Sequence, residues 1–295
     1  TQSRGLGDVY KRQTLRRLQL VTSWGSLTVA GGSRAGEGSL VLLPQLRLAL
    51  DPGRAHRALP PMNTVVVSHG HMDHVGGLGY WASQRYLNAM GPATLIAPAD
   101  IIEQLDQLLE LHAELEGGKP YQVETVSVAA GATHRFRDDF DLLFFSTDHW
   151  VPTLGTRIEW CRRRLRPELV GLPGEEIARR RQVGECVSEE IRLSLVSYCA
   201  DSGPQLFRRH PEVMDSEVVF LECSFYRPAD RARADRYGHL HLEDMMAVAG
   251  ELRCRHLVLL HASRRHRLRE VEHILDTELR PLLNCEMHHL MVDWE

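Results

Sequence analysis

Residues 64–74 read Thr-Val-Val-Val-Ser-His-Gly-His-Met-Asp-His and place four metal-binding side chains within six positions. The apolar start of this stretch predicts a strand, which presents His69, His71, Asp73 and His74 in the loop that follows it. Imidazole and carboxylate groups are ligands that zinc accepts. Alternate residues of an extended loop share one side, so the first two histidines can bind one metal. The adjacent Asp73–His74 pair can then reach a second metal.

Three further polar residues each follow an apolar run that predicts a strand. They are His149, Asp201 and His261. Ligands in such sheets gather at the carboxyl ends of strands, so all three are candidate metal ligands. Any one of them alone fits a capping or satisfied core residue equally well. Cys199 would face the same side of an extended strand as Asp201, and it stays open as an alternative ligand.

The pattern His-x-His-x-Asp-His at 69–74 resembles the signature of the metallo-β-lactamase superfamily. The resemblance implies an α/β fold, a four-layer αββα sandwich with a dinuclear metal site at its rim. It also implies how the ligands divide between the metals. One zinc is assigned to His69, His71 and His149, the other to Asp73, His74 and His261, and Asp201 bridges the two. A hydroxide bridging the metals is the expected nucleophile, because zinc lowers the pKa of water toward neutrality. The same ligands also take manganese or iron.

Two other regions resemble one branch of that superfamily, ribonuclease Z, the tRNA 3′-processing endonuclease. Residues 147–159 read Thr-Asp-His-Trp-Val-Pro-Thr-Leu-Gly-Thr-Arg-Ile-Glu, in which Val-Pro, a hydroxyl residue and Gly follow the histidine. Glu222 precedes His239 across a short Arg-rich stretch. The resemblance covers roughly residues 36–285. It implies removal of 3′ extensions from precursor tRNA, or cleavage of another RNA, and a homodimer.

Phosphodiester hydrolysis explains why these residue types occur together. It needs an in-line nucleophile, stabilisation of charge on the phosphoryl oxygens and a proton for the leaving 3′-oxygen. The metals provide the first two, and a histidine held in one tautomer by a carboxylate provides the third. We expect His239 to be that acid, Glu222 to orient it, and Asp73 to act also as a base. His241 competes for the role of His239, and a surface position beside a helix is the alternative for His239 itself.

Arginines near the predicted site are candidate phosphate ligands. The group between Glu222 and His239 is the best placed. It comprises Arg227, Arg231, Arg233 and Arg236. Residues 160–190 add further arginines and predict an irregular loop over the active-site face. Only 52 positions separate His149 from Asp201, which predicts no long protruding arm. Solvated arginines matched by nearby acids are the alternative interpretation.

Composition restricts the remaining possibilities. The chain has 295 residues, a formal net charge of −4 and 43% hydrophobic residues, so one globular domain over 14–295 is expected. No apolar run approaches the roughly 18 residues of a membrane span. The six cysteines include no CxxC pair, which favours free thiols in a reducing cytoplasm. Residues 1–13 look like an adapter or cloning scar, with the native start elsewhere.

Two other functions stay open on the sequence. One is a different hydrolase of the superfamily, acting on a small phosphodiester, a thioester or a lactone. The other is a metal-binding but inactive scaffold or RNA-binding module. The expected elements suit all of these functions. Strands are expected at 18–22, 26–29, 39–43, 46–50, 64–67, 122–128, 141–146, 193–199, 217–221 and 256–260, and helices at 78–90, 99–115, 242–252 and 268–279.

Overall fold

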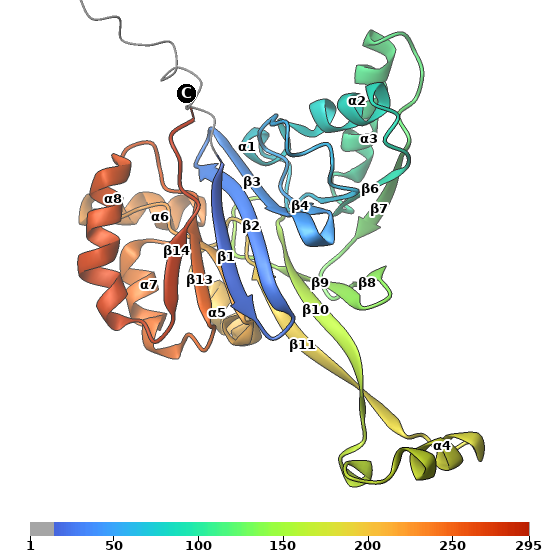
Figure 1. The fold of residues 1–295 in the computed structure, drawn as a ribbon. Helices are drawn as coiled ribbons and strands as arrows, with labels where there is room; N and C mark the ends of the chain where they lie inside the picture. Colours follow the sequence, from blue (N-terminus) through green and yellow to red (C-terminus); the bar gives the residue numbers. More distant parts are fainter. Residues whose placement is uncertain (1–14, 295) are drawn as a thin grey trace, which may run out of the picture.

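Two seven-stranded sheets pack face to face in residues 15–294, which are the residues that this computed structural model describes (Figure 1). The first sheet contains β1 (Arg16–Thr22), β2 (Gly25–Arg34), β3 (Gly38–Leu43), β4 (Leu48–Leu50), β5 (Thr64–Val66), β6 (Ala93–Pro98) and β7 (Val123–Val128), in that order. The second contains β14 (Glu286–His289), β13 (His256–Leu260), β12 (Val218–Glu222), β11 (Ser188–Tyr198), β10 (Leu154–Leu165), β9 (Phe140–Ser146) and β8 (Thr133–Arg137).

Helices cover the outer faces of both sheets (Figure 1). The first sheet carries α1 (Met72–Val75), α2 (Leu78–Leu87) and α3 (Ile102–Leu115), and the second carries α5 (Gln205–Arg209), α6 (Arg231–Tyr237), α7 (Leu242–Val248) and α8 (Leu268–Ile274). Trp81 and Leu105 pack α2 and α3 onto the first sheet, while Met245 and Val271 pack α7 and α8 onto the second. The expected four-layer αββα sandwich is therefore confirmed.

A core of side chains from both sheets fills the space between them. Leu50 and Val66 come from the first sheet, and Tyr198, Phe220 and Leu260 come from the second. All five residues of β12 are buried, as they are in β13. Parallel strands covered on both faces need such continuous apolar sequence, which explains why these runs show no polar alternation.

Strand direction brings the predicted ligands to one rim. In each sheet, four strands pair antiparallel and the following ones pair parallel, from β4 to β7 and from β11 to β14. Parallel strands end at the same edge of a sheet. The segments that leave β4, β5, β11, β12 and β13 therefore all emerge at this edge, and they contain nearly every candidate ligand.

Residues 160–190 form a protruding arm, so two predictions about them are wrong. β10 and β11 continue past the sheet as an antiparallel ribbon, and α4 (Gly174–Gln182) lies at its tip (Figure 1). The ribbon pairs Arg163 with Glu190 and Arg164 with Glu189, and the second pair also forms an ion pair at 2.6 Å. The segment is thus neither an irregular loop nor folded over the active site. Solvent surrounds the ribbon on both faces, so its sequence lacks the apolar alternation that predicts a strand.

The other expected strands and helices keep their type, although some differ in length. Several further strands were not expected. The strand expected at 46–50 begins at Leu48, because Pro44–Leu46 form a short 3₁₀ turn. The strands β6, β8, β10 and β14 were not anticipated. Within residues 15–294 no helix is long and apolar enough to cross a membrane. The interpretation of residues 1–13 as a scar lies outside the described residues, and the domain boundary at 14 stays a prediction.

Candidate metal centre and active site

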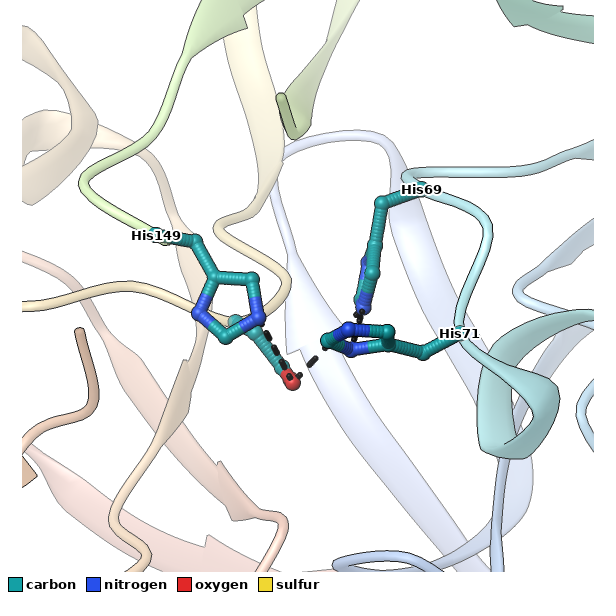
Figure 2. A group of neighbouring side chains, drawn as sticks. His69, His71 and His149 are labelled. Carbon is teal, nitrogen blue, oxygen red and sulfur yellow. Dashed lines mark hydrogen bonds and ion pairs between the residues drawn. The ribbon is translucent and has the colours of Figure 1, made fainter. Parts of the chain in front are cut away.

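Three imidazoles converge at the rim between the sheets. His69 and His71 lie in the loop after β5, and His149 lies in the loop between β9 and β10 (Figure 2). His69 Nε2 is 2.9 Å from His71 Nδ1, and it is 3.9 Å from the Oδ2 atom of Asp201. His149 Nε2 lies at the same distance of 3.9 Å from that carboxylate oxygen. One ligand atom of each residue falls within 4.8 Å of all the others, which is close enough to share one ion.

A second cluster adjoins the first. His261 Nε2 is 3.3 Å from Asp73 Oδ2 and 3.4 Å from His74 Nε2. Asp201 contacts this cluster too, because its Oδ1 lies 3.4 Å from His74 Nε2 and its Oδ2 lies 3.4 Å from His261 Nε2. The structure thus brings all seven predicted ligands together, with Asp201 between the two groups.

These residues fit divalent metal ions. His149 Nδ1 donates to the Gly238 carbonyl at 3.0 Å, which leaves a lone pair on Nε2. That Nε2 atom is buried and has no hydrogen-bond partner among residues 15–294. An unsatisfied buried polar atom is costly, and a metal ion would satisfy it. Imidazole and carboxylate donors suit zinc, and also manganese or iron.

The pKa shifts of most predicted ligands favour the protonation state that binds a metal. Burial lowers the pKa of His69, His71 and His149, so their imidazoles are neutral and keep a lone pair. Burial would raise the pKa of Asp73, but the hydrogen bond with His261 and the charges of His74 and His261 together outweigh burial, and the pKa falls. His74 differs, because Asp201 and Asp51 overcome burial and raise its pKa. A metal at His74 must therefore displace a proton.

Cys199 does not share the cluster, so the alternative that it replaces Asp201 is wrong. β11 ends at Tyr198, and Ala200 adopts a left-handed backbone with φ of 49°. The strand therefore does not stay extended through residue 201, which the alternative required. Cys199 packs in the apolar core under α5, and burial raises the pKa of its thiol.

Asp51 orients one ligand of each cluster, and its role was missed in the sequence. Its Oδ2 atom accepts from His74 Nδ1 at 2.8 Å and from the Ser68 hydroxyl at 2.7 Å. That hydroxyl in turn lies 2.9 Å from His69 Nδ1 and accepts its proton. Both rings are thereby held with Nε2 facing the metal positions, as second-layer carboxylates do in metal sites. Asp51 directly follows the apolar strand β4, so the strand-end rule that indicated Asp201 also applied to it.

Replacing Asp51 with asparagine should weaken metal binding about 10- to 100-fold, the usual effect of losing a partner of a metal-bound histidine. Competition with a chelator measures this affinity. Asp141→Asn is a matched control, because Asp141 is also a buried carboxylate but pairs with Arg135 on β8 and Arg192 on β11. Equal metal affinity in Asp51→Asn and wild type would contradict the proposed role.

His239 and Glu222 lie beside both clusters as expected. His239 Nδ1 donates to Glu222 Oε1 at 2.7 Å, and its ring centroid is 4.9 Å from that of His149 and 5.5 Å from that of His261. Glu222 also accepts from the Ser202 amide at 2.8 Å. Burial alone would lower the pKa of His239, but Glu222 raises it to about 9. The ring is therefore a charged donor held in one orientation.

His241 has a structural role instead. It occupies the N-cap of α7, where its side chain accepts from the Glu243 amide at 3.2 Å. Its Nε2 atom donates to the Arg227 carbonyl at 2.9 Å, and the side chain is almost fully buried. Both ring nitrogens are occupied, which removes His241 as a competitor for the catalytic proton.

The four candidate arginines divide by what they contact. Arg227 forms a two-pronged pair with Glu270, and Arg231 pairs with Asp235 and Asp244. Arg233 is exposed on α6. Arg236 lines a cavity of about 360 Å³ together with His149 and Trp150. Arg236 thus shares a cavity with a predicted metal ligand, while the ion pairs of Arg227 and Arg231 fit the alternative of solvated arginines matched by nearby acids.

Comparison with known proteins agrees with this architecture. The model of the beta-lactamase superfamily domain matches residues 28–262. tRNase Z TRZ1 of Arabidopsis thaliana is 28% identical over 248 residues, which cover 83% of this chain and 88% of the plant protein. Nuclear ribonuclease Z of Triticum aestivum is 30% identical over 163 residues, covering 55% of this chain and 92% of that protein. The crystal structure of the short form of human tRNase Z superposes with a TM-score of 0.54 at 15% identity, over 79% of this chain and 92% of the human chain. At this identity the last similarity concerns the fold alone.

Proposed function

The chain belongs to the beta-lactamase superfamily and, within it, to the ribonuclease Z family, and we propose that it removes 3′ extensions from precursor tRNA. It is a metal-dependent hydrolase. The observation that carries the proposal is the convergence of seven histidine and aspartate ligands beside the His239–Glu222 pair. The name of the Arabidopsis relative, a tRNase Z, supports tRNA as the substrate.

The residues of the chain have distinct roles in this proposal. Two divalent metal ions, zinc in our proposal, would supply the nucleophile and stabilise charge on the phosphoryl oxygens. His239 donates its proton to the leaving 3′-oxygen, and Glu222 keeps the ring in the tautomer that can do so. The lowered pKa of Asp73 makes it a weak base, so we assign it to metal binding rather than to proton removal.

Two further proposals concern where the protein works and how it assembles. Free cysteines, four of them buried, suit a reducing compartment such as the cytoplasm. The homodimer that the resemblance implies stays a prediction.

Cleavage of a 3′-extended precursor tRNA tests the proposed substrate. We expect one cut near the junction with the extension when zinc or manganese is supplied, and a roughly 100-fold slower reaction in Asp73→Ala, because one metal loses a ligand. Asp276→Ala changes an exposed carboxylate that pairs with Arg280 in the helical turns that follow α8, and it should cleave like wild type.

A chromogenic phosphodiester separates the main alternative from the proposal. Metal-loaded protein that hydrolyses this small substrate but leaves precursor tRNA intact would identify a small-molecule hydrolase. Metal-loaded protein that hydrolyses neither substrate would instead favour a thioester or lactone substrate, or an inactive scaffold.

A further inference from the structure

A second group of metal-binding side chains lies at the end of β13 remote from the active site. His256 is the first residue of β13, while His261 follows the last residue of that strand. Five residue steps separate the two positions, a span of roughly 17 Å along a strand. Glu286 and His288 lie on the neighbouring strand β14, and Glu286 pairs in register with His256. β13 and β14 run side by side at the edge of the second sheet (Figure 1).

The three ligand atoms form a triangle of the size that zinc requires. His256 Nδ1 is 3.3 Å from His288 Nε2 and 3.3 Å from Glu286 Oε2. The third side, from His288 Nε2 to Glu286 Oε2, is 3.6 Å. A tetrahedral zinc with bonds near 2.0–2.2 Å holds its ligand atoms roughly 3.3–3.6 Å apart. The two imidazoles and the carboxylate would therefore need little movement to bind one ion.

Hydrogen bonding fixes His256 in the form that binds metal. Its Nε2 atom donates to the Val21 carbonyl at 3.0 Å, so Nδ1 carries the lone pair and faces Glu286 and His288. Metal-bound histidines commonly donate their other ring nitrogen to a backbone carbonyl in this way. Val21 belongs to β1, so this bond also joins the first sheet to the second.

Burial leaves one side of the group open. The exposed fraction of the side chain is 4% for His256, 24% for His288 and 70% for Glu286. The buried histidine anchors the group, and solvent reaches the other two ligands. Three protein ligands with an open fourth position for water are the arrangement of catalytic zinc sites, and two histidines with one glutamate are among the known sets.

We propose that His256, Glu286 and His288 form a zinc site that is separate from the metal centre at the opposite rim. The site ties β14, the last strand of the second sheet, to β13 and, through His256, to β1 of the first sheet. The ion would fasten the edge strand β14 to β13, and the hydrogen bond between His256 and the Val21 carbonyl links β13 to β1 of the first sheet. The proposal does not rest on the tRNA substrate.

Zinc counting on the full chain tests the site. Protein stripped by a chelator is titrated with zinc alone, and bound zinc is counted by native mass spectrometry. His288→Ala should hold one zinc fewer per chain than wild type, and Glu286→Gln should bind that ion at least about 10-fold more weakly, because an amide is a poorer ligand than a carboxylate. His273→Ala changes an exposed histidine on α8 and should keep the wild-type count. Equal counts in wild type and His288→Ala would overturn the site and leave an ordinary hydrogen-bonded group.

A cysteine variant tests whether a third zinc ion is bound by the nearby thiols instead of by His256, Glu286 and His288. Cys254 and Cys285 hydrogen-bond through their thiols and lie close in sequence to His256 and Glu286. The double variant Cys254→Ser with Cys285→Ser should keep the full zinc count. Loss of an ion there, with none lost in His288→Ala, would assign it to the thiols and overturn the proposal. tRNA cleavage should be unchanged in His288→Ala, so failure of the zinc site and failure of the proposed function give different results.

Discussion

Asp201→Ala is expected to slow phosphodiester cleavage at least about 10³-fold, which is close to abolishing it. A metal ion contributes several kcal/mol of charge stabilisation to such reactions, and each 1.36 kcal/mol corresponds to a tenfold change in rate. Asp201 faces both clusters, because its two carboxylate oxygens lie 3.4 Å from His74 and His261 and 3.9 Å from His69 and His149. Its loss should therefore weaken both metal positions at once.

The metal content of the variant should fall together with its activity. Without the carboxylate, the buried imidazoles around position 201 lose the negative charge that offsets two cations. Elemental analysis of purified Asp201→Ala checks this, and circular dichroism checks that the sandwich is intact. Asp141→Ala provides the matched control, because it removes a buried carboxylate of β9 that contacts no predicted ligand. An Asp201→Ala protein that keeps both metals and cleaves within tenfold of wild type would refute the bridging role.

The metal ligands could be predicted from sequence because the information about them is local. A short apolar run predicts a strand, and a polar residue directly after it lies at the rim where parallel strands end. This rule places His69, Asp201 and His261 at the shared rim, where the structure also has them, without knowledge of which strands pair. It would also have indicated Asp51, which directly follows the strand expected at 46–50 but was interpreted only as part of the turn Asp51-Pro52-Gly53 that ends it.

The protruding arm and the remote histidine group could not be predicted in the same way. The arm depends on pairing between residues such as Arg164 and Glu189, which are polar and distant in sequence. The proposed zinc ligands His256 and Glu286 become neighbours only through the parallel register of β13 and β14. Conversely, Cys199 seemed a fair ligand only while the strand was assumed to stay extended, and a left-handed residue at Ala200 ends it. Strand register and backbone turns depend on how the whole sheet folds, so no short stretch of sequence predicts them.

His239→Ala is expected to lower kcat about 10²- to 10⁴-fold while the metal content stays as in wild type. The reason is that His239 supplies a proton to the leaving oxygen and is not needed to hold either metal. A substrate with a good leaving group needs no such proton, so the defect should shrink on an activated aryl phosphodiester. His241→Ala is the matched control, since this neighbouring histidine caps α7 and should affect stability but not kcat. Equal defects on RNA and on the activated substrate would rule out the acid role.

Glu222→Gln tests how that proton is held. The carboxylate raises the pKa of His239 to about 9, and removing its charge should lower this pKa. The acid acts only while it is protonated, so activity is lost as the pH rises through the pKa of His239. The alkaline limb of the kcat profile should therefore move to lower pH in Glu222→Gln, with the acidic limb less affected. A purely structural role for Glu222 would lower activity at every pH by a similar factor and leave the alkaline limb in place. That result would contradict the proposal that Glu222 controls the pKa of His239.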